Sequence, residues 1–172
     1  MSHARRGAVI FDRDGVLNED IGYCHTPERF VWIEGAREAV KAVNDAGLYA
    51  FVATNQSGVG RGYYAETDVL ALHAFLQAEL KVRSAWIDAF VYAPHHPEAA
   101  DPAYRQGAEL RKPEPGMILD LLARFPVDPK RAVMIGDKDS DIAAAEAAGI
   151  EGVKFAGGSL LAAIAPVIAR LR

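Results

Sequence analysis

Apolar positions along the chain alternate between two patterns, which predicts strands that alternate with helices. Short apolar runs, typical of buried strands, lie at residues 9–11, 48–53, 87–92, 132–135 and 152–155. Apolar residues spaced three or four positions apart predict helices at residues 35–45, 66–82, 115–125, 139–148 and 159–171. Pro166 is expected to interrupt the last helix, because proline cannot donate a backbone hydrogen bond.

This alternation favours an α/β fold. Crossover units of strand, helix and strand build a parallel sheet that is covered on both faces. We therefore expect a Rossmann-like doubly wound parallel sheet in a three-layer α/β/α arrangement. No internal repeat, low-complexity segment or linker divides the sequence, so residues 1–172 are expected to form a single domain.

Composition excludes several classes of partner. The net charge of −4 offers no basic surface for nucleic acid or anionic lipid, so neither is expected to bind. Cys24 is the single cysteine, which rules out an internal disulfide. No apolar run is long enough to span a bilayer, and no apolar segment typical of a signal peptide follows the basic start of the chain. We expect a soluble, cytoplasmic protein that is a monomer.

Polar side chains follow several of the predicted strands at the point where each strand ends. Asp12 and Asp14 follow the first strand, Thr54 follows the second, and Asp137 follows the fourth. Lys112 precedes the helix that begins near Pro115, with Arg111 before it. Because ligands bind beyond the carboxyl ends of parallel strands, these side chains are expected to meet there.

These residue types in one place suit phosphoryl transfer. Carboxylates that share a pocket repel one another unless a cation lies between them, and Mg²⁺ prefers oxygen ligands. Thr54 and Lys112 would bind the phosphate oxygens that the metal leaves free. The alternative is ordinary: Thr54 simply ends its strand, and Arg111 and Lys112 are solvated loop cations.

Four ordered motifs carry a resemblance to a known family. They are Phe-Asp-Arg-Asp-Gly-Val-Leu-Asn at 11–18, Thr-Asn-Gln-Ser-Gly at 54–58, Arg-Lys-Pro-x-Pro-Gly at 111–116 and Gly-Asp-Lys-x-x-Asp at 136–141. In this order they resemble the haloacid dehalogenase-like (HAD-like) phosphatases, over residues 8–150. Within that superfamily they are most similar to the branch of histidinol phosphatases and D-glycero-D-manno-heptose 1,7-bisphosphate 7-phosphatases.

The resemblance implies a role for each central residue. Asp12 matches the nucleophile that becomes an aspartyl-phosphate, and Asp14 matches the general acid and base. Thr54 and Lys112 match the residues that hold the transferring phosphoryl group. The implied Mg²⁺ site consists of the Asp12 carboxylate, the Asp14 backbone carbonyl and Asp137. The implied reaction is Mg²⁺-dependent hydrolysis of a phosphomonoester.

The resemblance also implies substrate contacts. Arg111 matches a substrate-recognition arginine, and Asp141 is expected to support the site from behind its ligands. The other matching positions are Asp20, Tyr23, Asn55, Gln56, Ser57 and Lys138. The partner is expected to be a small phosphorylated metabolite. A heptose bisphosphate is favoured, and histidinol phosphate or another metabolite remains an alternative.

The sequence departs from the family at a loop that often binds structural zinc. The positions that would carry the four ligands hold Ala93, His95, Ala108 and Leu110. One imidazole cannot hold zinc alone, and the neighbouring His96 does not replace three absent ligands. Structural zinc is therefore expected to be absent. The two histidines are either ordinary loop residues or substrate contacts.

Spacing and motif order weigh against other architectures and functions. The segments between the motifs are largely taken up by the predicted helices and strands, so no cap domain is expected and the pocket should be open. A response-regulator receiver also forms an aspartyl-phosphate, but its lysine comes last, whereas Lys112 precedes Asp137 here. A phosphotransferase is disfavoured because an open pocket admits water to the intermediate.

Overall fold

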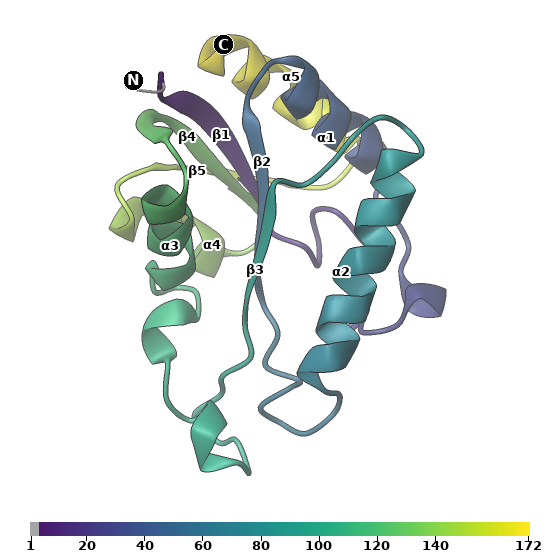
Figure 1. Cartoon of the computed structure of the whole chain (residues 1–172), viewed down its shortest axis with the longest axis vertical. Helices are drawn as coiled ribbons and strands as arrows, with labels where there is room; N and C mark the ends of the chain where they lie inside the picture. The colour runs from purple at the N-terminus through teal and green to yellow at the C-terminus, as the bar shows by residue number, and fades with distance from the viewer. Residues whose placement is uncertain (1–3) are drawn as a thin grey trace.

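The computed structural model describes residues 4–172, and its centre is a five-stranded parallel sheet (Figure 1). Along the sheet the strands follow the order β3-β2-β1-β4-β5. Their bounds are Arg6–Phe11 for β1, Tyr49–Asn55 for β2, Ala89–Ala93 for β3, Val127–Gly136 for β4 and Glu151–Lys154 for β5. The chain moves outward from β1 to β3 and then continues on the other side of β1. The expected doubly wound sheet is confirmed, and its switch point lies between β1 and β4.

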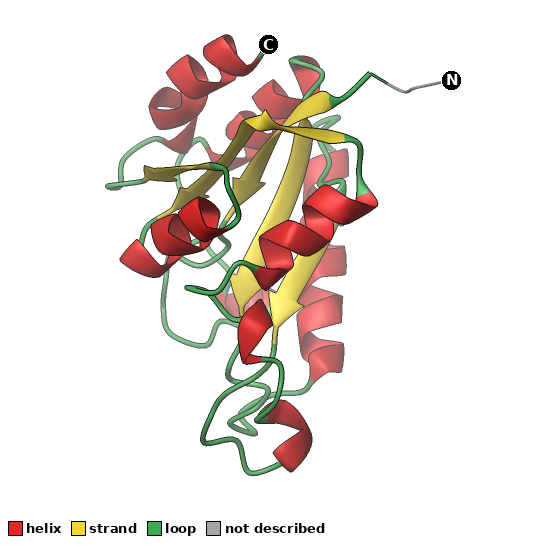
Figure 2. Cartoon of the chain, turned by 90° about the vertical axis from the view of Figure 1, so that its left-hand side faces the viewer, coloured by secondary structure: helices red, strands yellow, loops and turns green. Residues whose placement is uncertain are grey.

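Five α-helices cover the two faces of the sheet and complete three layers (Figures 1 and 2). Helices α1, α2 and α5 lie on one face, and α3 and α4 lie on the other. Their bounds are Ala36–Asp45 for α1, Glu66–Lys81 for α2, Gly116–Arg124 for α3, Asp139–Ala147 for α4 and Leu160–Leu171 for α5. Within the described residues, none of these helices has the length and apolar character needed to cross a lipid bilayer.

Strand β1 divides the core into two parts. Val9 and Phe11 point toward the helices α1 and α5, whereas Ala8 and Ile10 point toward α3 and α4, and all four side chains are fully buried. Burial of a large apolar side chain contributes about 1.5–3 kcal/mol to the free energy of folding. With apolar packing on both faces, β1 is a rigid support for the residues that follow it.

Strand β4 is longer than its apolar run predicts. It begins at Val127, which pairs with Arg6, and the register then shifts, so that Ala132 pairs with Ala8. Between these pairs lies the polar segment 128–131, which includes Pro129. The sequence does not indicate a strand there, because the segment is exposed or half-buried and lies at the bulge.

Helix α5 contradicts the expectation that Pro166 would break it. The helix is continuous from Leu160 to Leu171 with Pro166 inside. Pro166 lies on the exposed face, where water can bind the carbonyl group that loses its helical partner. On the opposite face Ile164, Val167 and neighbouring apolar residues are buried in the core that α5 shares with α1. This packing outweighs the local cost of proline.

The connections at the carboxyl end of the sheet are loops with short 3-10 helices. The loop between β1 and α1 contains Pro27–Arg29, and the loop between β3 and α3 contains Pro102–Tyr104 and Ala108–Leu110. In Figure 1 the second loop extends well below the sheet. Neither segment of the described chain forms a separate cap over the strand ends.

Candidate active site

A small cavity of about 60 Å³ lies at the carboxyl ends of β1, β2 and β4, and we call it the inner chamber. The four residues predicted to do the chemistry, Asp12, Asp14, Thr54 and Lys112, all line it. The remaining lining residues are Asn55, Lys138, Ser140 and Asp141. The structure therefore brings a carboxylate pair, a hydroxyl group and an ammonium group together from distant parts of the chain.

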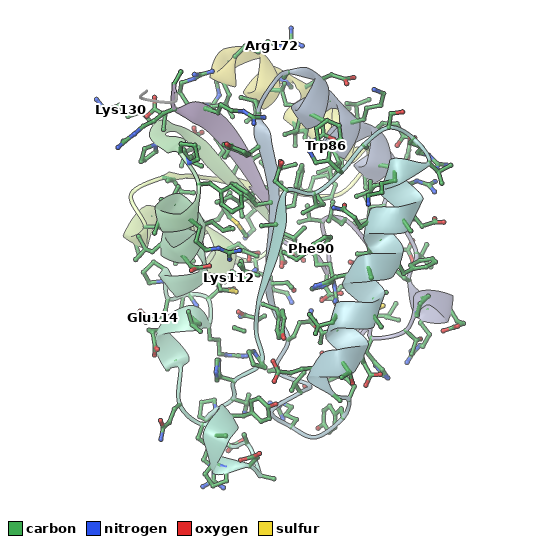
Figure 3. The ribbon with its side chains drawn as sticks, viewed as in Figure 1. Trp86, Phe90, Lys112, Glu114, Lys130 and Arg172 are labelled. Atoms are coloured by element: carbon green, nitrogen blue, oxygen red, sulfur yellow. The ribbon has the colours of Figure 1, made fainter. Side chains whose placement is uncertain are left out.

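Lys112 is the only lysine that the described chain buries. Figure 3 shows it in the interior, whereas Glu114 lies at the edge of the molecule. Its Nζ donates to Asp12 Oδ1 at 2.8 Å, to Asp141 Oδ1 at 2.6 Å and to the Ala53 carbonyl at 2.9 Å. Burial lowers the pKa of Lys112, but the carboxylates of Asp12 and Asp141 outweigh it and raise the pKa overall. The side chain thus supplies a fixed positive charge.

Asp12 is buried directly after β1. Its Oδ1 accepts hydrogen bonds from Lys112 and from the backbone N–H of Arg13 at 2.9 Å. Burial raises the pKa of Asp12 to about 7, against the opposing charge of Lys112 and with the help of the negative charge of Asp141. A divalent cation beside this carboxylate would offset the negative charges and favour the ionised form.

Carboxylates gather beside the inner chamber in a way that suits a cation. Oxygen atoms of Asp12, Asp137 and Asp141 all lie within 4.8 Å of one another. Gly15 makes room for Asp137, because a Cβ atom there would lie 2.1 Å from Asp137 Oδ2. Asp137 Oδ1 is buried and has no hydrogen-bond partner among the described residues. An all-oxygen set with an unpartnered buried carboxylate oxygen fits a hard divalent cation such as Mg²⁺.

Asp141 joins this cluster from the first turn of α4. Its Oδ2 accepts the backbone N–H of Lys138 at 3.1 Å and so caps the helix, while its Oδ1 binds Lys112. A Cβ atom on Gly136 would lie 2.1 Å from the Cβ of Asp141, so only glycine permits this approach. Because both oxygens already accept hydrogen bonds, Asp141 holds Lys112 in place, the supporting position that its motif implies.

Asp14 accepts four hydrogen bonds from three side chains. Arg13 Nη2 donates to both carboxylate oxygens at 3.2 Å, Asn18 Nδ2 donates to Oδ1 at 2.9 Å, and Gln56 Nε2 donates to Oδ2 at 3.1 Å. Arg13 is fully buried and also donates to the Cys24 carbonyl at 2.6 Å. The carboxylate of Asp14 is thus fixed in direction while its side chain is still in part accessible from the chamber.

A wider cavity of about 590 Å³ shares part of its lining with the inner chamber, and we call it the outer chamber. Every residue predicted to contact substrate lines it, namely Asp20, Tyr23, Asn55, Gln56, Ser57, Arg111 and Lys138. Lys138 Nζ pairs with Asp20 at 3.2 Å and so joins two loops that are far apart in the sequence. The two chambers share Asp14 and Lys112, among other residues, so a ligand could occupy both at once.

Two of these residues direct their side chains toward the protein. Asn55 donates to the Lys112 carbonyl and accepts from the Lys112 N–H, both at 3.0 Å. It therefore holds the backbone of Lys112. Gln56 is buried and donates to Thr54 at 2.9 Å as well as to Asp14. Arg111 differs from both, because the one hydrogen bond that its side chain makes to the described residues is a long contact of 3.5 Å to the His95 carbonyl.

The loop from Pro94 to Leu110 is fastened by side chains. Tyr92 donates to Glu66 Oε1 at 2.7 Å, and Tyr104 donates to Glu66 Oε2 at 2.8 Å, so one carboxylate of α2 ties strand β3 to this loop. His96 bonds with Arg61 at 2.8 Å. The His95 ring packs against Gly107. These contacts fasten the loop that contains His95, Ala108 and Leu110.

Sequence reasoning missed four residues that the structure places at the site. Arg13 and Asn18 lie inside the first motif but were not assigned a role, and both bind Asp14. Ser140 lines both chambers, and Tyr64 lines the outer one. The motif that contains Arg13 and Asn18 could have indicated them. Nothing in the local pattern of the chain distinguishes Tyr64 from the exposed Tyr63.

Comparison with known proteins agrees with the class that the fold and site define. A doubly wound sheet with two aspartates after β1, Thr54 near the carboxyl end of β2, a buried lysine and Asp137 after β4 is the arrangement expected of the HAD-like hydrolases. Residues 109–165 match the family model described as HAD-hydrolase-like.

Curated relatives narrow the class. The chain is 49% identical over 156 residues to D-glycero-beta-D-manno-heptose-1,7-bisphosphate 7-phosphatase of Rhodopseudomonas palustris. The aligned residues cover 91% of this chain and 87% of the relative. It is 40% identical to D-glycero-alpha-D-manno-heptose-1,7-bisphosphate 7-phosphatase of Burkholderia mallei, over 83% of this chain and 76% of the relative.

A solved structure is similar over most of its length. D,D-heptose 1,7-bisphosphate phosphatase from B. bronchiseptica, complexed with magnesium and phosphate, superposes with a TM-score of 0.79 at 30% identity, covering 93% of this chain and 86% of that one. The chain belongs to the HAD-like phosphatases, and it is a phosphoric monoester hydrolase.

Proposed function

We propose that this protein removes the 7-phosphate from D-glycero-D-manno-heptose 1,7-bisphosphate by Mg²⁺-dependent hydrolysis. The observation that carries the proposal is the pair of connected chambers, one for the reacting phosphoryl group and one for the rest of a larger ligand. Arg111, Lys112 and Lys138 give the outer chamber three cations. No carboxylate of the described chain forms an ion pair with Arg111, which suits recognition of a second phosphate. The names of the relatives add support.

In the first step, the carboxylate of Asp12 attacks phosphorus and the bond to the sugar oxygen breaks. Both hydrogen bonds to Asp12 reach Oδ1, which leaves Oδ2 to form the new bond. Asp14, protonated at this stage, gives its proton to the departing oxygen. Lys112 and Thr54 stabilise the negative charge on the oxygens of the transferring phosphoryl group.

In the second step, water attacks phosphorus of the aspartyl-phosphate, and the bond to Asp12 breaks. Asp14, now ionised, takes the proton from that water and returns to its starting form. The side chains of Arg13, Asn18 and Gln56 donate to this carboxylate and hold it in place. Asp12 and Asp137, with the Asp14 backbone carbonyl that the motif implies, would hold Mg²⁺, which would supply positive charge beside the phosphate oxygens.

The proposal is tested by phosphate release from a panel of esters, ranked by kcat/KM. The panel contains both anomers of the heptose bisphosphate, histidinol phosphate and a small chromogenic ester, all at saturating Mg²⁺. We expect a heptose bisphosphate to rank first, and the panel also decides which anomer is preferred. A higher kcat/KM for histidinol phosphate would replace the proposed substrate while keeping the class of reaction.

The proposal also covers the state of the protein. We expect an active monomer in the cytoplasm. We also expect that it needs no structural zinc, because Ala93, Ala108 and Leu110 offer no metal ligand beside His95. Size-exclusion chromatography with light scattering tests the first point. An active species found only as a dimer would contradict it.

A further inference from the structure

A directional path of hydrogen bonds leads from Tyr64 to the carboxylate of Asp14. The Tyr64 hydroxyl donates to Gln56 Oε1 at 2.6 Å, and Gln56 Nε2 donates in turn to Asp14 Oδ2 at 3.1 Å and to Thr54 Oγ1 at 2.9 Å. Gln56 is buried, so both ends of its amide need partners inside the protein. Tyr64 supplies the partner for the oxygen end.

The packing around Tyr64 is built to hold its hydroxyl group there. A Cβ atom on Gly58 would lie 2.1 Å from Cε1 of the ring, so the absence of a side chain at this position lets the ring approach. On another side the His25 ring stacks at 4.6 Å with an interplanar angle of 7°. Val59 and Val69 complete the buried cluster. Burial raises the pKa of Tyr64 to about 12, so the phenol keeps its proton at neutral pH.

We propose that Tyr64 is a positioning residue for catalysis: its hydroxyl fixes the amide of Gln56, and the amide fixes the carboxylate of Asp14 toward the inner chamber. The inference rests on the proposed function, because it assigns acid and base chemistry to Asp14. An amide has one donating and one accepting end, whereas ionised Asp14 only accepts. A Gln56 side chain without its Tyr64 partner leaves a buried carbonyl oxygen unsatisfied, and its shift toward another donor removes one of the bonds that orient Asp14.

The expected effect is on the chemical step. Tyr64→Phe keeps the ring and its stacking but removes the hydroxyl group. General acid and base catalysis contributes about 10²–10⁴ to the rate, and we expect a misdirected Asp14 to lose roughly tenfold in kcat. The KM for the substrate should change by less than about twofold, because Tyr64 offers substrate the same ring face.

Tyr63→Phe is the matched control. It makes the same chemical change one residue earlier, on a side chain that is 56% exposed and whose hydroxyl makes no hydrogen bond within the described chain. Gln56→Met is the second variant, since it interrupts the path at its middle. The double variant Tyr64→Phe with Gln56→Met completes the set, because two changes on one path should not multiply.

The experiment measures kcat and KM for a phosphomonoester at saturating Mg²⁺, with rates normalised to the folded fraction from urea denaturation. Tyr64→Phe and Gln56→Met should each lower kcat roughly tenfold, the double variant should be no slower than Gln56→Met alone, and Tyr63→Phe should match wild type. Equal kcat for Tyr64→Phe and Tyr63→Phe in an active enzyme would overturn this inference alone, as would a multiplicative loss in the double variant. A wild-type protein that hydrolyses no phosphomonoester would overturn the proposed function as well.

Discussion

Replacement of Lys112 by methionine tests the electrostatic design of the site. The change keeps most of the length of the side chain and removes its charge. In the wild type the ammonium group lies between Asp12 and Asp141, at 2.8 Å and 2.6 Å, and its side chain is only 3% exposed. Lys112→Met therefore leaves two buried carboxylates next to each other without their shared counter-ion.

The magnitude follows from this burial. Removal of one partner from a buried ion pair costs about 3–5 kcal/mol, because the remaining charge is desolvated and uncompensated. Domains have an unfolding free energy of only about 5–15 kcal/mol, so the loss is a large share of the total. The stability lost in Lys112→Met should also be smaller when one of the two carboxylates is replaced by a neutral amide. We expect Lys112→Met to cost roughly 0.5–3 kcal/mol less in an Asp141→Asn background than in the wild type.

The assay is urea denaturation of the wild type, the two single variants and the double variant, without divalent cation. Lys138→Met is the matched control, since the Lys138 side chain is 60% exposed and pairs with Asp20 at 3.2 Å. Exposed ion pairs contribute about 0–1 kcal/mol, so the control should stay near wild type. If Lys112→Met is no more destabilising than Lys138→Met, or if its cost is the same with and without Asp141→Asn, the buried charge cluster is not as we describe it.

Three further outcomes follow from the site. Arg111→Ala should lower kcat/KM for the heptose bisphosphate about thirty- to a thousand-fold, which corresponds to the loss of about 2–4 kcal/mol expected for a broken charged contact. The same variant should leave kcat/KM for a small ester nearly unchanged. Equal slowing of both esters would refute the role of Arg111 in substrate recognition. Exhaustive EDTA treatment should abolish turnover, and Mg²⁺ should restore it, whereas full activity without metal would contradict the cation site. Elemental analysis of the purified, untagged protein should find no stoichiometric zinc, since tightly held zinc would show that the loop at 94–110 binds metal after all.

The positions that could be predicted from sequence are those that topology alone brings together. Asp12 and Asp137 follow β1 and β4, and Thr54 is the penultimate residue of β2. The carboxyl ends of these parallel strands share one edge. The apolar spacing of α2 likewise predicted its buried stripe, with Val69 and Leu72 among its members. In both cases the information is local and regular.

Contacts that depend on side-chain packing could not be predicted in this way. Tyr63 and Tyr64 are adjacent residues of the same type, so the local sequence does not distinguish them. Tyr64 is buried because its ring packs against Gly58, whereas Tyr63 is exposed. Pro166 shows that a correct local tendency can also mislead. Proline does disfavour a helix, but the packing of α5 on α1 outweighs this tendency. The predicted substrate contact Gln56 lines the outer chamber, but its amide binds Asp14 and Thr54.

The central claim is that Asp12 carries the phosphoryl group during hydrolysis of the 7-phosphate. The most direct measurement is a rapid quench of enzyme with heptose bisphosphate and Mg²⁺, followed by borohydride treatment and mass spectrometry of the peptide that contains Asp12. Borohydride reduces an acyl phosphate to an alcohol and leaves a free carboxylate unchanged. Our account predicts the reduced side chain at Asp12 in the wild type and none in an unreacted sample. Release of phosphate with an unmodified Asp12 at every quench time would contradict it.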